Sequence, residues 1–148
     1  MGMEEVRFVF WKDRIGGEFA TLTEKLEPYG YRVSGVAEWV MAIADEDKTV
    51  KKDESVNIKI KPVEFPGGAI AFPCSFMRHA LGVVLGIHKA GSPKHVESTR
   101  VADEVIFFPI KDGEVKKGDL LSVINVIYVS VKEKEIIRDY VKKIKRFR

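Results

Sequence analysis

Four residues within one short stretch carry most of the chemistry that this sequence offers. Cys74, Ser75, Arg78 and His79 lie within six consecutive positions, between two apolar runs of β-type composition. A turn between strands is usually built from Asn-Gly or Asp-Gly, whereas this interruption supplies a thiol, a hydroxyl, a guanidinium and an imidazole. We predict that the four residues line one concave ligand site, because a turn between core strands exposes its polar side chains at the mouth of a barrel.

An anion pocket is the chemistry that this group favours. The planar guanidinium of Arg78 offers a fork of donors suited to phosphate or carboxylate, and the Ser75 hydroxyl and backbone N–H groups complete such a pocket. A structural ion pair of Arg78 is an equally weighted alternative. Its candidate partners are three aspartates elsewhere in the chain: Asp45, Asp47 and Asp103.

Two other chemistries are weaker. An imidazolium of His79 near Cys74 would lower the pKa of the thiol and activate it, but a lone cysteine in apolar surroundings is more often a small buried hydrophobe. A metal site would use three histidines and one aspartate: His79, His88, His95 and Asp103. The spacings between these histidines match no standard zinc pattern, so we predict no metal site. No cofactor and no reaction are assigned.

Length and composition bound the fold. A chain of 148 residues with 45% hydrophobic content can bury a core in one domain without disulfides or metal. The single cysteine and the absence of an N-terminal apolar run like a signal peptide predict a cytoplasmic protein. The apolar runs are shorter than the roughly 20 residues of a membrane-spanning helix. A charged fraction of 32%, rich in Lys and Glu, is typical of thermophile proteins.

The net charge of +3 is concentrated in the tail. Residues 132–148 hold eight Lys or Arg and three acidic residues, which leaves 17 basic and 19 acidic residues in the rest of the chain. Four apolar residues of this segment follow the spacing of one helix face: Ile137, Tyr140, Val141 and Ile144. Acidic residues near its start and basic residues near its end also suit a helix dipole. We therefore favour a docked C-terminal helix over nucleic-acid binding through the tail.

The elements that must position the candidate site are mainly β-strands. Short alternating or β-branched runs separated by Gly, Pro and Asp turns predict strands at 6–11, 18–26, 38–44, 55–63, 69–72, 81–88, 105–110 and 120–131. The run 18–26 also has features of a short helix, and we favour a strand that pairs with the first run. Gly82 and Gly86 predict a bulge or a close backbone approach.

A short internal repeat suggests two equivalent halves. The sequence VKKD at 50–53 returns as VKKGD at 115–119, and each copy follows an acidic or Asp-Gly turn and leads into a long strand. We predict a barrel or β-clip-like sandwich of about eight to ten strands with one C-terminal helix. The expected organisation is a single domain, with a β-hairpin extension at 1–34, a barrel core at 35–131 and a basic helix at 132–148.

Four segments between Val36 and Val131 carry a resemblance to a known family. They are AEWVMAIADED, VNIKIKPVEFPGGAIAFPCSFMRHALGVV, VADEVIFFPIKDG and VKKGDLLSVINVIYV. They resemble the archaeal family of domains of unknown function number twenty-two (DUF22). The resemblance implies an archaeal source, domains that occur singly or in tandem, and no assigned activity or catalytic residue.

A more distant resemblance is to the β-clip barrels of the dUTPase type. In that family a Pro-Gly turn enters a strand that ends in a small-polar and basic segment, and a Lys-Lys-Gly-Asp corner precedes the last long strand. PGGAIAFPCSFMRHALGVV and EVKKGDLLSVINV are similar to this arrangement. The dUTPase hairpin has an Asp followed shortly by Tyr-Arg, whereas Asp103 is followed by Glu-Val-Ile, so dUTP hydrolysis is not implied.

These observations predict a β-barrel that binds a small anionic or nucleotide-like molecule. The expected ligand-binding residues are Cys74, Ser75, Arg78 and His79. A non-catalytic interaction or assembly module, forming homo-oligomers through exposed strand edges, is the first alternative. Nucleic-acid binding through the basic tail is the second. Whether the protein is an enzyme is not decided by the sequence.

Overall fold

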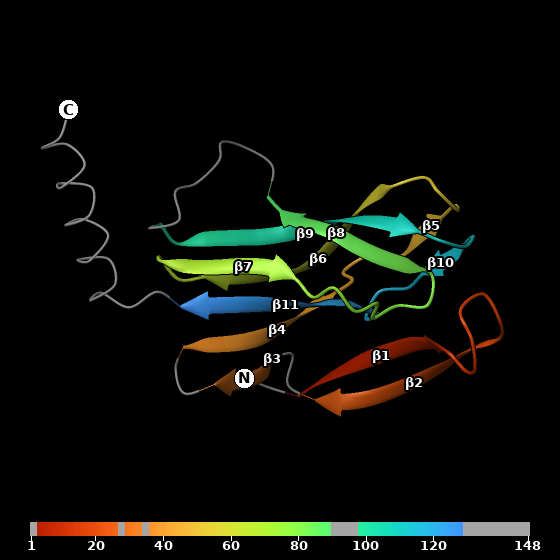
Figure 1. Cartoon of the computed structure of the whole chain (residues 1–148), viewed down its shortest axis with the longest axis horizontal. Helices are drawn as coiled ribbons and strands as arrows, with labels where there is room; N and C mark the ends of the chain where they lie inside the picture. Colours follow the sequence, from red (N-terminus) through yellow and green to blue (C-terminus); the bar gives the residue numbers. More distant parts are fainter. Residues whose placement is uncertain (1–2, 27–28, 34–35, 90–97, 129–148) are drawn as a thin grey trace, which may run out of the picture.

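The computed structural model describes residues 3–26, 29–33, 36–89 and 98–128, and these residues form eleven β-strands (Figure 1). In chain order the strands are β1 (Glu4–Trp11), β2 (Phe19–Leu26), β3 (Tyr29–Val33), β4 (Ala37–Ile43), β5 (Lys48–Val50), β6 (Val56–Phe65), β7 (Ala69–Pro73), β8 (Gly82–His88), β9 (Arg100–Pro109), β10 (Gly113–Val115) and β11 (Leu120–Tyr128). The prediction of a mainly β fold is confirmed. The helix predicted at 132–148 lies outside the described residues. Within them, no helix has the length and hydrophobicity to cross a membrane.

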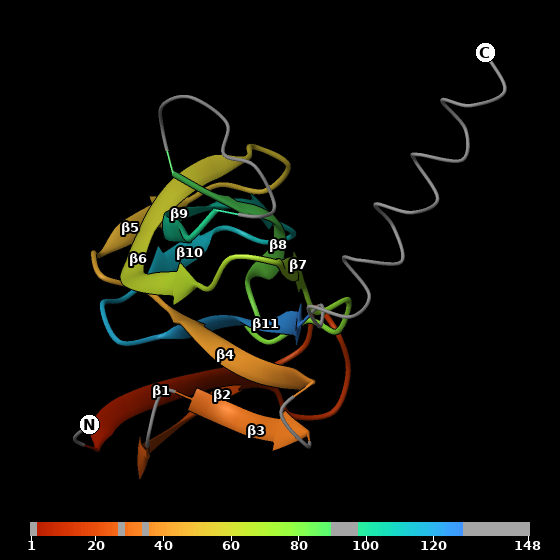
Figure 2. The ribbon, with the colours of Figure 1, turned by 90° about the vertical axis from the view of Figure 1, so that its left-hand side faces the viewer.

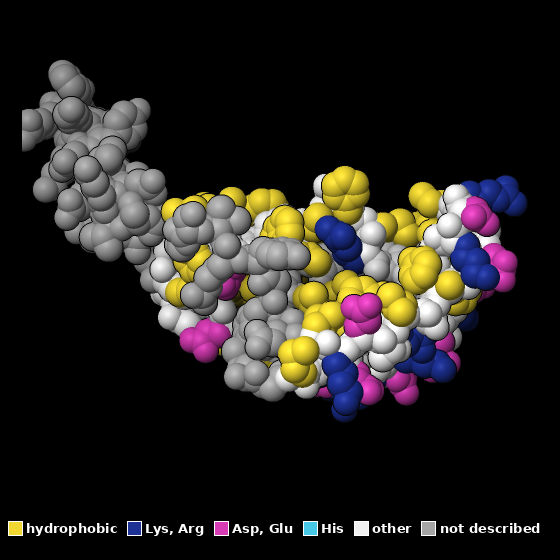
Figure 3. All heavy atoms as spheres, turned by 90° about the horizontal axis from the view of Figure 1, so that it is seen from below, with side chains coloured by type: hydrophobic (Ala, Val, Ile, Leu, Met, Phe, Trp, Pro, Cys, Tyr) yellow, Lys and Arg dark blue, Asp and Glu magenta, His cyan; other side chains and the backbone are white. Residues whose placement is uncertain are grey.

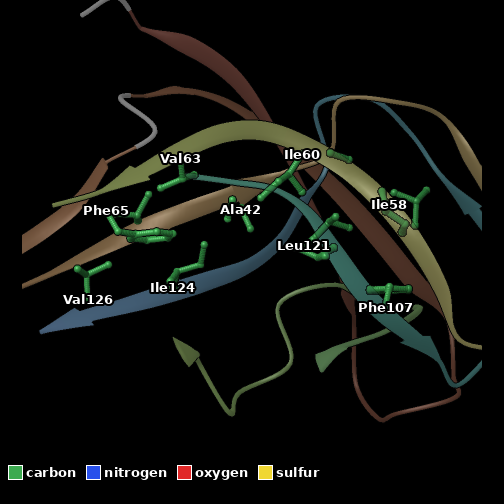
Figure 4. Close-up of a cluster of buried hydrophobic side chains, with 14 of the residues drawn as sticks. Ala42, Ile58, Ile60, Val63, Phe65, Phe107, Leu121, Ile124 and Val126 are labelled. Carbon is green, nitrogen blue, oxygen red and sulfur yellow. The ribbon is translucent and has the colours of Figure 1, made fainter. Parts of the chain in front are cut away.

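Two larger sheets enclose the hydrophobic core. One has the strand order β3-β4-β11-β7 and the other β6-β9-β8 (Figure 2). On β6, Ile58 and Ile60 are buried while the intervening Lys59 is exposed, as the period of two in a strand requires. Side chains from both sheets meet in the core (Figure 4): Val40, Ala42, Leu121, Ile124 and Val126 from one, and Ile58, Ile60, Val63, Phe65 and Phe107 from the other.

The sheets are not closed into a barrel. In the described part of the chain, the two larger sheets meet at an isolated bridge between Ala44 and Ile60. The edge strands β7 and β8 are joined by the irregular segment 74–81, whose backbone bonds to other elements instead of extending a ladder between them. Of the two architectures that we predicted, a barrel or a β-clip-like sandwich, the barrel is therefore not observed, because the sheets stay open.

The N-terminal hairpin adds a third layer against the first sheet. β1 pairs antiparallel with β2 from Glu4–Leu26 to Trp11–Phe19, which confirms the strand interpretation of residues 18–26. Val6 packs with Ile43 and Leu120 beneath the hairpin. Figure 3 shows hydrophobic side chains on the surface of the molecule seen from below, and the exposed large apolar residues of the hairpin include Phe10, Phe19 and Leu22. β3 pairs with β4, so the predicted boundary at 34/35 falls between two hydrogen-bonded strands.

Both glycines of β8 serve the roles that the sequence predicted. The register between β8 and β9 shifts between Val84 and Gly86, which marks a β-bulge. A Cβ atom on Gly82 would lie 2.3 Å from the carbonyl oxygen of Phe108. Only glycine permits that approach, so β8 can lie tightly against the end of β9 beside the candidate site.

The internal repeat is a true structural repeat. β5 and β10 pair antiparallel, and the middle pair is Thr49 with Glu114, which are 65 positions apart like the two copies of the repeat. Each corner contains the same four-residue turn: Glu54 N–H donates to Lys51 O at 3.1 Å, and Asp119 N–H donates to Lys116 O at 2.9 Å. The third residue of each turn has a positive φ, 65° at Asp53 and 94° at Gly118.

Hydrogen bonds between the halves follow the same two-fold relation. Asp53 N–H donates to Pro109 O and Gly118 N–H donates to Ala44 O. Two aspartates accept reciprocal bonds from the corners: Asp112 from Lys52 N–H at 2.7 Å, and Asp47 from Lys117 N–H at 2.8 Å. The long strands are exchanged as well, because β4 of the first half pairs with β11 and β6 pairs with β9 of the second. The β4–β5–β6 and β9–β10–β11 units thus form a pseudo-symmetric pair.

Candidate functional site

A hollow of about 290 Å³ opens beside the segment that links β7 to β8. Residues 73–78 form one wall, residues 83–85 of β8 form another, and Leu121 and Ser122 of β11 also line it. Most of these side chains are apolar. The polar and charged groups come from Cys74, Ser75, Arg78 and Ser122, so the hollow combines apolar walls with a few polar groups at one side.

The segment around the hollow is fixed at both ends. Cys74 N–H donates to Val123 O at 2.8 Å, which continues the pairing of β7 with β11 by one residue. At the other end, Ala80 N–H donates to Val9 O of β1, also at 2.8 Å. The intervening residues Ser75 and Phe76 are exposed. The local sequence thus forms a short arch whose backbone is held by the sheet and by the hairpin.

His79 lies at the foot of this arch and does not line the hollow. Its side chain is fully buried, and its Nε2 lies 2.9 Å from Asp119 Oδ2. Leu81 N–H donates to His79 Nδ1 at 3.1 Å, which places the imidazole proton on Nε2, from which it is donated to the carboxylate. His79 therefore has a partner for each ring nitrogen and anchors the arch to the second corner.

Asp119 is the centre of this buried network. Its carboxylate, also fully buried, accepts the His79 bond and a bond from Lys116 N–H at 3.0 Å. Arg7 Nε of β1 lies 2.9 Å from Asp119 Oδ1, an ion-pair distance at which the N–H is not aimed well enough for a hydrogen bond. One side chain thus joins the hairpin, the second corner and the arch that borders the hollow.

Arg78 is exposed and has no acidic partner among the described residues. The ion pair considered as an alternative is not formed. Two of its candidate partners bind Lys117, Asp45 to Nζ and Asp47 to the backbone N–H, and Asp103 lies 3.7 Å from Lys89. The guanidinium contacts Cys74 Sγ at 3.7 Å and lies 6.0 Å from the centroid of the Phe76 ring.

Cys74 sits at the wall of the hollow as a half-buried free thiol. Its partial burial acts to raise the pKa, but a hydrogen bond from the Phe76 backbone N–H and the bond and positive charge of Arg78 together outweigh that effect, so the pKa of the Cys74 thiol is lowered. A larger thiolate fraction near neutral pH follows. The thiolate is the nucleophilic form of cysteine, so the lowered pKa favours the form of Cys74 that reacts with electrophiles.

The structure brings three of the four predicted residues together and adds others. Cys74, Ser75 and Arg78 border the hollow, whereas His79 supports it from below. Among the described residues, no three His, Cys, Asp or Glu side chains form a group suited to a metal ion, and His95 lies outside them. From the sequence alone, Asp119 was not identified as the partner of His79. The position of Asp119 at the end of the repeated Lys-Lys corner is the sequence feature that pointed to it.

Comparison with known proteins places the chain in a family without assigned function. The profile described as "Domain of unknown function DUF22" matches residues 5–113, most of the chain. The matched residues include the β1–β2 hairpin, whereas the resemblance described in the sequence analysis began at Val36. An uncharacterised protein of Methanocaldococcus jannaschii is 26% identical over 112 residues, which cover 76% of this chain and 85% of that protein.

No solved structure matches the chain. The predicted likeness to β-clip barrels of the dUTPase type is not shown by these comparisons and stays a prediction. The features of this chain that bear on function are therefore the residues of the hollow and of the buried network around Asp119.

Proposed function

The chain belongs to the DUF22 family, whose description assigns no activity, and we propose that it binds a small anionic molecule in the hollow beside the β7–β8 arch. The observation that carries this proposal is the Arg78 guanidinium, which stands at an apolar hollow without a carboxylate partner in the described chain. An arginine in such a position is available to a ligand, because its described hydrogen bond goes to Cys74 Sγ and its guanidinium has no carboxylate partner in the described chain.

The chemistry of the lining suits a phosphate or a carboxylate. The guanidinium can pair two of its N–H groups with two oxygens of one anion, while the hydroxyl of Ser75 adds a donor nearby. The apolar walls would enclose a small hydrophobic or ring portion of the same molecule. The volume of about 290 Å³ is at the lower end of ligand pockets, which favours a small metabolite.

The anchoring of the arch supports a binding role. His79 and Asp119 hold the end of the arch from within the core, and the pairing of Cys74 with Val123 holds its start. An arch fixed in this way loses little conformational freedom when a ligand binds, so more of the interaction energy appears as affinity.

The direct test is ligand binding by variants of Arg78. Inorganic phosphate, acetate and adenosine monophosphate serve as probes, and thermal shift measurements at increasing probe concentration give the apparent affinity. We expect Arg78→Ala to weaken binding about tenfold or more and Arg78→Lys to restore it only in part, because an ammonium lacks the bidentate fork.

A matched control removes the same charge elsewhere. Arg14 is exposed in the β1–β2 turn and does not line the hollow, so Arg14→Ala should bind the probes like the unchanged protein. Absence of a shift with every probe, or equal loss in the Arg78 and Arg14 variants, would overturn the proposal.

A second measurement uses the single cysteine as a reporter. Because the pKa of Cys74 is lowered, alkylation by iodoacetamide should reach half of its maximal rate at a pH below that of a free thiol. Arg78→Ala should move this midpoint upward, since it removes one hydrogen bond and one positive charge. A bound anion should slow the alkylation in the unchanged protein. An unchanged midpoint in the variant would show that Arg78 does not act on the thiol.

A further inference from the structure

The outer face of the first sheet carries four exposed large apolar side chains, arranged in two rows across the strands. Residues directly opposite in neighbouring strands share a face, so Trp39, Asn125 and Phe72 form one row across β4, β11 and β7. Ala37, Ile127 and Ile70 form the next row. The large apolar side chains of both rows are between 43% and 47% exposed: Trp39, Ile70, Phe72 and Ile127. We call these two rows the apolar face.

The other half of the same sheet surface is already covered. Met41 and Ile43 follow Trp39 at two-residue spacing along β4 and therefore point to the same side. Both pack under the β1–β2 hairpin with Val6 and Phe8. The hairpin thus covers the end of this surface near the second corner, and the exposed apolar face lies at the other end, where β11 finishes.

We propose that the C-terminal segment 129–148 of the same chain covers the apolar face. β11 ends at Tyr128, directly after Ile127 of the exposed row, and 20 further residues follow. The segment therefore begins at the edge of the apolar face. Its sequence supplies an apolar stripe for that surface, the four residues at helical spacing from Ile137 to Ile144.

The dimensions agree with this arrangement. Eight residues, 129–136, separate Tyr128 from the stripe and can span up to about 26 Å, which is ample for the chain to reverse over the sheet. A helical stripe from Ile137 to Ile144 is about 10 Å long. Three strands at a spacing of about 4.8 Å present a surface of about the same width.

The charge of the segment is consistent with an outer layer. Its eight basic side chains need water, and at helical spacing Lys142 and Arg146 lie on the side opposite the stripe. An amphipathic segment in this position would remove the apolar face from solvent and keep its own charges exposed. A second copy of the protein on the same face is the competing occupant, and the experiment distinguishes the two.

Trp39 is the natural reporter because it lies within the apolar face. The full-length chain with Trp11→Phe contains Trp39 as its single tryptophan, and acrylamide quenching measures how much of its ring is accessible. In this background, Ile137→Ser with Ile144→Ser should raise the quenching constant about twofold, because the ring loses its apolar cover. Arg146→Ser, which changes the opposite side of the segment, should leave the constant unchanged.

The reciprocal variant keeps the test valid if the tail substitutions disturb folding. Phe72→Ser changes an exposed position, so the fold should persist, as a far-UV circular dichroism spectrum would verify. Trypsin should then cleave the Lys- and Arg-rich segment several-fold faster than in the unchanged protein, since an undocked segment is more accessible.

Three outcomes would overturn the proposal. The first is equal quenching of Trp39 with and without the two serine substitutions. The second is a protection of Trp39 that disappears on dilution, which assigns the face to a second copy of the chain. The third is tail cleavage that does not respond to Phe72→Ser.

Discussion

The two corners of this protein share a backbone and differ in what is attached to them. Each has the same turn, the same bond to the opposite half and the same aspartate cap, yet Glu54 is exposed at the end of the first turn while Asp119 is fully buried at the end of the second. The difference arises from two elements that bond to the second corner: β1, through Arg7, and the arch, through His79.

The duplicated part of the fold and the part that carries the candidate site are therefore different. The repeated hydrogen bonds hold the two halves together and would do so without any ligand. The arch between β7 and β8 breaks the symmetry, since Ile110 N–H bonds to Leu81 O of the arch whereas the equivalent Asp45 N–H bonds to Lys59 O of β6. The hollow thus lies at the arch, which is the part of the chain that departs from the repeat.

The largest expected effect comes from replacing the two residues that end the turns. Asp119→Ala should lower the free energy of unfolding by about 3 kcal/mol or more, because His79 Nε2–H and Lys116 N–H lose their acceptor inside the protein. Glu54→Ala should change it by less than about 0.5 kcal/mol. Urea denaturation of both variants measures the difference, and similar values for the two would show that the buried network adds no stability.

A smaller difference in stability is expected when the residue with positive φ is replaced in each turn. Gly118→Ala should cost about 1–2 kcal/mol, since a Cβ at φ 94° is strained even though its nearest neighbour, Glu5 O, is 3.9 Å away. Asp53→Gly should change stability by less than about 0.5 kcal/mol, because relief of strain is offset by the greater entropy of glycine in the unfolded chain. Equal losses in the two variants would contradict the assignment of the turns.

The smallest expected effect on stability comes from the two aspartates that accept backbone hydrogen bonds at the corners, and it tests whether the two corners are equivalent. Asp47→Ala and Asp112→Ala should each cost about 0.5–1 kcal/mol, because both carboxylates are exposed and each accepts one backbone N–H. The two losses should agree within about 0.3 kcal/mol and should add in the double variant if the caps are independent. Thermal unfolding of the single and double variants provides the values. Clearly unequal losses would mean that the corners are equivalent in geometry but not in energy.

Local patterns in the sequence predicted much of this fold. Alternation along residues 55–63 predicted one buried and one wet face because side chains of a strand alternate whatever the strand pairs with. Glycine at 82 and 86 predicted a close approach and a bulge for a similar local reason. The repeated Lys-Lys corner predicted two equivalent turns, since a turn is specified by four adjacent residues.

Pairing between distant strands was not predictable in the same way. The exchange of β4 and β6 between the halves depends on which strands meet across the core, and many alternating strands have compatible faces. The sheets also stay open because segment 74–81 bonds to β1 and β11, a choice that no pattern within the segment reveals.

In the candidate site, too, some features follow from the local sequence and others from the tertiary structure. The sequence by itself determined that a thiol, a hydroxyl and a guanidinium stand together between two strands, because their neighbours in the chain hold them there. The tertiary structure alone decided that His79 turns inward, because its partner Asp119 is 40 positions away and is brought near by the second corner. It also decided that Arg78 remains exposed, because its three candidate aspartate partners bind lysines elsewhere.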